Sequence, residues 1–292
     1  MTNSHSHSRS RRLAKAGTFA IGLGLIGLTL VTSSSASSAA QTTPPEPPGA
    51  SPSGTKPSWS VQAPQAPAAA GLLLAQGIET YQTLAQTQYN HRYTISPSAG
   101  TYFWDCIGFV NWALEQATPN AWSAFHTAMN VPTNNSGRVG LWATFLTGNP
   151  GPSWSVVPAV NQLTGGEVMI VPGEVVVGGR VIYGSADENG GYPGHAVIIA
   201  GPPLPLSDGS YAVFVYDSTA LPGHGKWDSR NFDARALDEP GTTRASGTGY
   251  GTMRLTVSAT GAPTAVYWSA STKNPITFQG QNVVPVLARP LN

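Results

Sequence analysis

The chain has 292 residues, of which only 10% are charged, with 15 lysines and arginines against 14 aspartates and glutamates. Four of the basic residues and none of the acidic ones lie in residues 1–40, so the remainder is slightly acidic and offers no polybasic face to nucleic acid. The single cysteine, Cys106, excludes an internal disulfide and leaves a free thiol. The fold must therefore depend on its hydrophobic core.

Residues 1–40 have the pattern of a cleavable secretory signal. Arginines and one lysine precede an apolar run over residues 19–31, and small residues follow up to residue 40. The apolar run is shorter than the roughly 20 residues that a membrane span needs. We therefore expect a secreted or cell-envelope protein with no stable membrane insertion after cleavage. A twin-arginine pair at Arg11 and Arg12 leaves the choice between Sec and twin-arginine export open.

Residues 41–70 are rich in proline, alanine and serine and contain almost no large apolar side chain. Such a composition cannot bury a core and is typical of an extended linker. The remaining residues, 71–292, are enough for one sizeable domain. We expect a signal over 1–40, a disordered linker over 41–70 and one folded domain over 71–292.

The domain begins with two helical patterns. The first covers residues 72–88, and the second starts at the cysteine, where Ile107, Val110 and Leu114 recur at helical spacing. Asp105 is a good N-cap, so Cys106 falls in the first turn. A helix N-terminus favours a thiolate by only about 0.3–1 kcal/mol. A histidine would have more effect, because a paired imidazolium can lower a cysteine pKa from about 8.5 to about 3–4.

The pattern of the rest of the domain changes from helix to strand. Residues 118–162 predict two short helices whose aromatic side chains pack in the core. Strands are expected at 167–171, 175–177, 181–183, 195–201, 211–217, 253–257, 265–268 and 283–288. Pro285 predicts that the last strand lies at a sheet edge, and residues 247–251 are interpreted as a flexible glycine stretch. The fold class is therefore α+β.

Strands 195–201 and 211–217 predict an antiparallel hairpin. Symmetric pairing about residue 206 places His195 directly opposite Asp217, at a distance where a carboxylate can hold an imidazole. A slip of one residue would put the two on opposite faces. Taken alone, the pair is also consistent with polar residues at strand ends near solvent. His224, in a Pro-Gly-His-Gly loop, is interpreted as a solvated turn residue.

Four segments together resemble the NlpC-type cell-wall peptidases: Trp104-Asp105-Cys106-Ile107-Gly108-Phe109-Val110, Gly165-Gly166-Glu167-Val168-Met169, the segment around Gly194-His195-Ala196, and Tyr216-Asp217. The resemblance implies a papain-like fold, with N-terminal helices that include the nucleophile helix packed on an antiparallel sheet. It implies Cys106 as nucleophile, His195 as base and Asp217 as the residue that orients His195.

The same resemblance implies three supporting residues. Tyr93 corresponds to a tyrosine beside the nucleophile and is expected to assist the oxyanion. Asp105 and Ile107, which flank the cysteine, are the candidate substrate-binding residues; the family commonly has serine where this chain has Ile107. The substrate implied is a peptide bond of a peptidoglycan stem. No metal or cofactor motif accompanies these residues.

Two other functions stay open on the sequence alone. One is an envelope-binding module that keeps the fold but lacks catalysis. The other is a cysteine amidase or acyltransferase that acts on a substrate other than peptidoglycan, which an apolar residue after the cysteine would favour.

Overall fold

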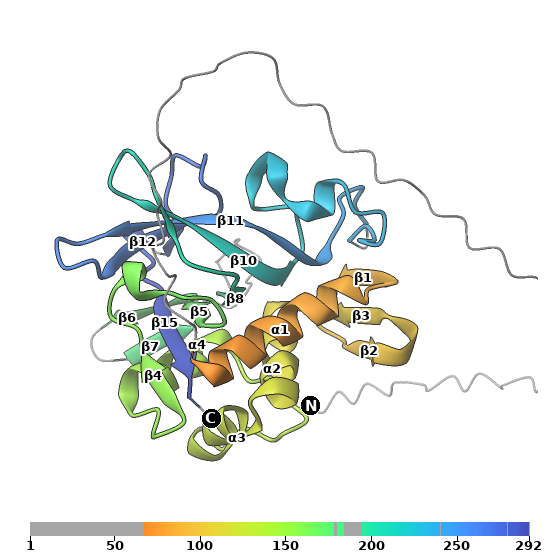
Figure 1. The fold of residues 1–292 in the computed structure, drawn as a ribbon, viewed down its shortest axis with the longest axis horizontal. Helices are drawn as coiled ribbons and strands as arrows, with labels where there is room; N and C mark the ends of the chain where they lie inside the picture. The colour runs from red at the N-terminus through yellow and green to blue at the C-terminus, as the bar shows by residue number, and fades with distance from the viewer. Residues whose placement is uncertain (1–66, 178–179, 184–193, 240, 279, 292) are drawn as a thin grey trace, which may run out of the picture. The chain divides into compact units, whose positions relative to one another are not determined.

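The computed structural model describes residues 67–177, 180–183, 194–239, 241–278 and 280–291 (Figure 1). The predicted signal, most of the predicted linker and the turn residues Gly178 and Gly179 lie outside this part of the chain. All the described residues belong to one unit that spans residues 59–292. Within the described ranges, no helix is both long enough and apolar enough to cross a membrane.

The structure confirms the α+β class and the helix at the cysteine. The helices are α1 Ala68–Gln82, α2 Cys106–Ala117, α3 Pro119–Ala128 and α4 Val139–Gly148. Single 3-10 turns lie between strands, at η1 Pro97–Ala99, η2 Val160–Gln162, η3 Gly225–Trp227 and η4 Ser229–Asn231. The two short helices expected in 118–162 are α3 and α4.

The first helix differs from its prediction at both ends. It starts at Ala68, inside the predicted linker, because Ala69 and Ala70 are buried against the domain. It stops at Gln82, because residues 86–89 pair in parallel with the strand that leads into the cysteine helix. Leu84 and Ala85, the apolar residues after Gln82 in the predicted helix, therefore lie in the connection between α1 and β1.

Within the described residues, the strands form one large sheet and three small ones. The large sheet has the order β12-β11-β10-β8-β5-β15-β4, with β9 paired to β10. The other sheets are β1-β3-β2, β6-β7 and β13-β14. The bounds are β1 Gln86–Tyr89, β2 Thr94–Ser96, β3 Thr101–Trp104, β4 Trp154–Val156, β5 Val168–Val171, β6 Glu174–Val177, β7 Arg180–Tyr183, β8 His195–Ile199, β9 Leu204–Pro205, β10 Tyr211–Thr219, β11 Gly247–Val257, β12 Pro263–Tyr267, β13 Thr277–Phe278, β14 Gln281–Asn282 and β15 Val286–Pro290.

Two strand predictions are wrong. The glycine stretch 247–251 is the first half of β11 and pairs along its whole length with β10. The last strand, β15, is not at an edge, because it pairs with β5 on one side and β4 on the other. Pro285 does not interrupt it, since the strand begins at the next residue.

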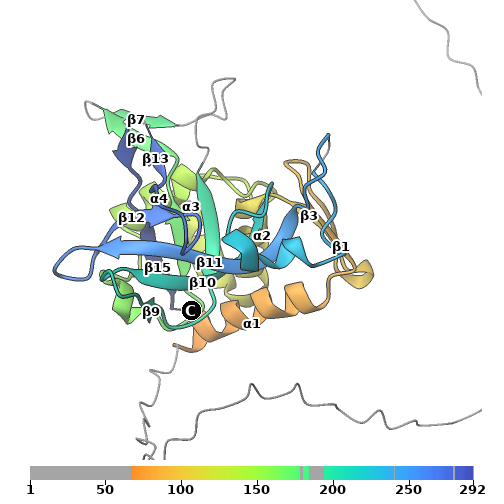
Figure 2. The same ribbon diagram turned by 90° about the horizontal axis from the view of Figure 1, so that it is seen from above.

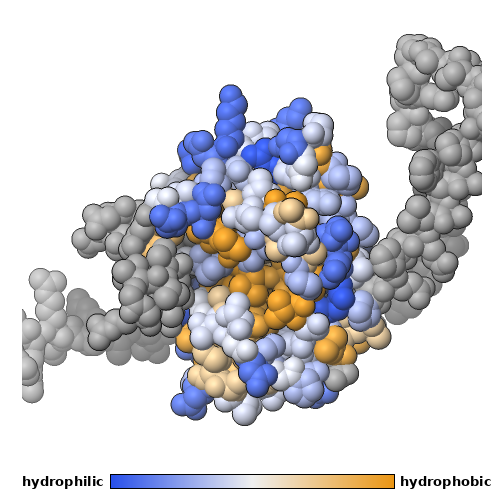
Figure 3. Space-filling model, turned by 90° about the vertical axis from the view of Figure 1, so that its left-hand side faces the viewer, coloured by the Kyte–Doolittle hydropathy of each residue, from blue (hydrophilic) through white to orange (hydrophobic). Residues whose placement is uncertain are grey.

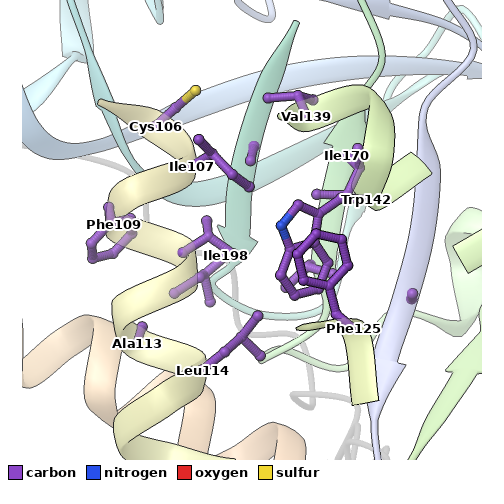
Figure 4. Close-up of a cluster of buried hydrophobic side chains, with 14 of the residues drawn as sticks. Cys106, Ile107, Phe109, Ala113, Leu114, Phe125, Val139, Trp142, Ile170 and Ile198 are labelled. Atoms are coloured by element: carbon purple, nitrogen blue, oxygen red, sulfur yellow. The ribbon is translucent and has the colours of Figure 1, made fainter. Parts of the chain in front are cut away.

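Side chains alternate between two cores on the two faces of the sheet. On β8, Ala196 and Ile198 face the helices, whereas Val197 and Ile199 face the second core. The helices α1 and α2 lie together on the first face (Figures 1 and 2). As expected, most of the aromatic side chains of α3, α4 and β4 are buried in this core, which Figure 4 shows around Trp142.

Glu167 closes the turn that precedes β5. Its carboxylate is fully buried and accepts hydrogen bonds from the backbone N–H groups of Thr164 and Gly165 and from Arg289 of β15, at 2.6 Å for the Nη2 atom. The Glu167 of the Gly-Gly-Glu motif therefore has a structural role in joining the start of β5 to the end of the chain.

Glu167→Ala should lower the free energy of unfolding by about 3 kcal/mol, because it leaves Arg289 and two backbone donors without their acceptor. Urea denaturation of the variant measures this loss. Glu79→Ala, which removes an exposed carboxylate from α1, is the matched control and should change stability by less than about 0.5 kcal/mol. Equal losses in both variants would contradict the role given to Glu167.

Candidate active site

The cysteine lies at the N-terminus of α2, as the sequence predicts. Asp105 is the N-cap in an extended conformation, and its carboxylate accepts a hydrogen bond from the backbone N–H of Gly108 at 2.8 Å. Cys106 is the first residue of the helix and is 4% exposed. Figure 4 shows its sulfur at the end of α2, above the apolar side chains of the core.

His195 and Asp217 come together, although in a register different from the predicted one. The structure pairs Val215 with Ile199 and Tyr216 with Ile198, which shifts the hairpin by two residues. A shift of two keeps both side chains on one face and makes them diagonal neighbours. The Nε2 atom of His195 lies 2.6 Å from Oδ2 of Asp217, and both side chains are buried. The predicted contact is therefore confirmed, and the predicted direct opposition is wrong.

Strands β8 and β10 separate beside His195 and Asp217. Their pairing ends at Tyr216, although β8 continues to His195 and β10 to Thr219. In a regular antiparallel ladder, every second residue of one strand donates its N–H to the other strand. The N–H of Ala200 donates to the carbonyl oxygen of Phe214, so a continued ladder would direct the N–H of Ala196 at the carbonyl oxygen of Ser218.

The end of α2 lies where these strands separate. The N–H of Ala196 faces the Cys106 thiol, and the hydroxyl of Ser218 donates to the carbonyl of Trp104 at 3.0 Å. These contacts hold the thiol of Cys106 next to the backbone N–H of Ala196, the residue after His195. The two side chains do not form a hydrogen bond with each other, and within the described part of the chain Nδ1 of His195 has no hydrogen-bond partner.

The electrostatic surroundings favour a neutral thiol and a neutral imidazole. Burial, followed by the nearby Asp105 carboxylate, raises the pKa of Cys106, and the N–H of Ala196 opposes the rise only in part. Burial lowers the pKa of His195; the hydrogen bond to Asp217 opposes this, and the charge of Arg230 adds to it. The site thus differs from a preformed thiolate–imidazolium pair.

Asp217 has two further partners that the sequence analysis does not assign. His224, expected as a solvated turn residue, is 3% exposed, and its Nε2 atom lies 2.8 Å from Oδ2 of Asp217. Arg230 is also buried and donates from Nη1 to Oδ1 of Asp217 at 2.9 Å. Asp217 itself is fully buried rather than near solvent. Burial would raise its pKa, but Arg230 and His224 lower that pKa well below the usual value.

Sequence reasoning missed Arg230 for a physical reason. It lies in an irregular segment with no periodicity, and its partner is thirteen residues away. The only available signal was the spacing Asp228-Ser229-Arg230, in which Asp228 caps the short turn η4 and also binds the guanidinium.

Tyr93, Asp105 and Ile107 lie together, but their contacts only partly fit the roles expected of them. The Tyr93 hydroxyl donates to Oδ1 of Asp105 at 2.7 Å and accepts from Ser136, so its proton is not available to an oxyanion in this arrangement. Oδ2 of Asp105 lies 3.1 Å from Nδ1 of His91. Ile107 is 5% exposed and packs in the helix-side core. The structure thus gives Asp105 a capping role and Ile107 a packing role.

A cavity of about 830 Å³ opens beside His195. The described residues that line it are Tyr89, Gly194, His195, Thr219, Ala220, Leu221, Pro222, Gly223, Arg230, Asn231, Asp238, Thr243, Arg244, Ala245 and Trp268. A second hollow, of about 600 Å³, is lined by alanine, threonine, valine, proline and leucine side chains, and apolar side chains gather on the face shown in Figure 3. Because only the first contains titratable groups, it is the candidate substrate site.

No family model, curated protein or solved structure matches this chain. The candidate site is therefore interpreted from its own geometry.

His195, Asp217 and His224 could also be considered as metal ligands, because their ligand atoms lie within 4.8 Å of one another. However, both imidazoles direct Nε2 at the same carboxylate oxygen, at hydrogen-bond distance. The positive guanidinium of Arg230 occupies the other oxygen. The Asp217 carboxylate is thus an acceptor of N–H hydrogen bonds from both imidazoles and the guanidinium, which fits this cluster better than a divalent cation bound among the same groups.

Proposed function

We propose that this protein is an exported cysteine hydrolase of papain-like architecture that cleaves an amide bond, with peptidoglycan stem peptides as the favoured substrate class. The observation that carries the proposal is the buried His195–Asp217 hydrogen bond beside a cysteine at a helix N-terminus, whose thiol faces the residue after His195. The resemblance of the same segments to NlpC-type peptidases supports the substrate class.

The geometry supports a mechanism in which proton transfer accompanies attack. Since His195 donates from Nε2 to Asp217, its Nδ1 atom carries the lone pair and is the base. Nδ1 takes the thiol proton as the sulfur of Cys106 forms a bond to the acyl carbon. The C–N bond then breaks as the imidazolium returns this proton to the leaving amine. Water, activated by the same imidazole, hydrolyses the thioester.

The backbone N–H groups at the start of α2 can hold the developing oxyanion, because the first turn of a helix leaves its N–H groups without intrahelical acceptors. Asp105 already accepts from the N–H of Gly108. The N–H of Cys106, the first residue of the helix, is assigned to the oxyanion.

The full-length protein incubated with purified cell-wall fragments should release peptides with new amino and carboxyl ends, identified by mass spectrometry. Cys106→Ala is the control and should release none. Cleavage of simple amides or esters without cleavage of cell-wall fragments would favour an amidase or acyltransferase instead. Equal products with and without Cys106 would contradict the proposal.

The buried, neutral thiol supports a second candidate, an envelope-binding module that uses the cavity beside His195. It predicts that Cys106→Ala binds cell-wall fragments as tightly as the wild type and that neither protein cleaves them. Sedimentation with insoluble cell wall distinguishes this candidate from the first.

A further inference from the structure

Three glycines lie at alternate positions of β11. The pairing of β10 with β11 sets Asp217 opposite Gly249, Val215 opposite Gly251 and Thr219 opposite Gly247. Directly opposed residues share one face of a sheet, so all three glycines lie on the face that carries Asp217. They leave a buried strip of backbone without side chains beside the Asp217 carboxylate.

His224 and Arg230 occupy the space above this strip. A Cβ atom on Gly249 would lie 2.7 Å from Nη1 of Arg230, and one on Gly251 would overlap the Cβ atom and ring of His224. Neither Gly249 nor Gly251 has a positive φ, so the backbone conformation does not require glycine there. Glycine is needed at these two positions because a larger residue would collide with the side chains of His224 and Arg230.

The hydrogen-bond partners of His224 fix its protonation. Nδ1 lies 2.8 Å from the backbone carbonyl oxygen of Trp268, which can only accept. Nε2 lies 2.8 Å from Oδ2 of Asp217, which also only accepts when the carboxylate is ionised. Arg230 at the other oxygen keeps Asp217 ionised. Both ring nitrogens of His224 therefore donate, and the ring is an imidazolium.

The charges of the buried cluster balance only in this state. Arg230 pairs with Asp217 and with Asp228, whose Oδ2 atom lies 3.0 Å from Nη2. The four side chains of Asp217, His224, Asp228 and Arg230 are buried, and they carry two negative and two positive charges when His224 is protonated. A neutral His224 would leave one uncompensated buried negative charge, which is costly.

We propose that His224 is a positioning residue: a buried imidazolium that, together with Arg230, fixes the Asp217 carboxylate and neutralises it, so that Asp217 orients His195 but does not make it strongly basic. The effect of His224 on turnover rests on the proposed function of Cys106 and His195. The protonation of His224 does not depend on that function.

The groups around His195 support this assignment. Asp217 faces it from β10 and favours its protonated form, whereas His224 and Arg230, from the segment after β10, oppose protonation. Asp228 accepts hydrogen bonds from the backbone N–H of His224 and from the guanidinium of Arg230. Tyr89, Asp238 and Arg244 line the same cavity as His195, and Cys106 and Asp105 lie at the N-terminal end of α2. A proton on His195 would add a third positive charge to a cluster that is already balanced.

Nitrogen NMR of the histidine rings in the wild-type protein tests the protonation without any turnover. His224 should carry protons on both ring nitrogens at pH 7, and its signals should disappear in His224→Gln. Burial alone would lower its pKa, but the Asp217 carboxylate raises it above the ordinary value. A single ring proton on His224 at pH 7 would overturn the proposal, even if the protein proves to be a hydrolase.

Alkylation of Cys106 by iodoacetamide at pH 6 tests the effect on His195. In His224→Gln the pKa of His195 should rise, and each unit of rise increases the thiolate–imidazolium population about tenfold. We expect alkylation about 3- to 10-fold faster than in the wild type. His126→Gln, which changes another buried histidine in α3, is the control and should leave the rate unchanged. An unchanged or slower rate in a folded His224→Gln would show that His224 has only a structural role.

Discussion

Cys106→Ala should abolish amide hydrolysis, with a loss of at least about 10⁴-fold in kcat/KM, because removing the nucleophile removes the covalent route while substrate binding remains. Cys106→Ser should be almost as inactive. Its hydroxyl would occupy the same buried position, but a neutral imidazole whose pKa is lowered by burial is a weak base for an alcohol. Release of peptide ends from cell-wall fragments measures both losses.

Val110→Ala is the matched control for this prediction. Val110 is fully buried one turn further along α2, so its truncation costs stability without touching the reacting atoms. The control should lose more stability than Cys106→Ala and retain activity at a temperature where it is folded. Retained hydrolysis in Cys106→Ala would exclude the proposed mechanism.

Asp217→Asn should lower turnover by about 10³-fold. The amide can present either its oxygen or its NH₂ group to Nε2 of His195, so part of the population holds the wrong tautomer, as in serine enzymes where the equivalent change costs about 10⁴. Because the thiol and the imidazole are neutral at rest, the site resembles a serine site in needing the correct tautomer before attack. The loss should appear in kcat more than in KM.

The same variant should be less stable by about 3–5 kcal/mol near pH 7, because Arg230 and His224 lose the buried charge that both of them bind. The folded-state pKa of Asp217 lies below its unfolded value. The stability that its charge contributes is therefore fully present above about pH 4, the pKa of an unfolded aspartate, and is lost as the pH falls further. The stability difference from the wild type should shrink below about pH 4.

Asp208→Asn is the control for the second prediction, since Asp208 is an exposed carboxylate whose ion pair with Arg254 is long, at 3.6 Å. It should change stability by less than about 0.5 kcal/mol and leave turnover unchanged. An Asp217→Asn protein with wild-type stability and turnover would remove Asp217 from the site.

The sequence predicts the positions that follow from local rules. The N-cap at Asp105 and the start of α2 depend on neighbouring residues only, and they are confirmed. The His195–Asp217 contact was predicted because the alternation of side chains along a strand is robust to a shift of two residues. The shift itself could not be predicted, because no local pattern indicates that β9 pairs with the start of β10 or where β8 diverges from β10.

The parts of the site that the sequence does not predict depend on distant packing. Gly249 and Gly251 look like a flexible stretch, since nothing local shows that His224 and Arg230 will lie on them. The burial of His224 has the same cause: a Pro-Gly-His-Gly sequence is typical of a solvated turn, and only the tertiary fold brings its ring to Asp217. The resemblance implies that Tyr93 assists the oxyanion, and Ile107 is the candidate for substrate binding. In the structure Ile107 packs in the core, and the Tyr93 hydroxyl donates to Asp105.

The proposed mechanism requires that Cys106 becomes acylated during turnover. Acid quenching of the wild-type protein during its reaction with cell-wall fragments, followed by intact-mass measurement, should show one added acyl group. Hydroxylamine should remove it, and peptide mapping should place it on Cys106. Hydrolysis that proceeds with no adduct on Cys106 under these conditions, and at the same rate in Cys106→Ala, would show that Cys106 is not the nucleophile.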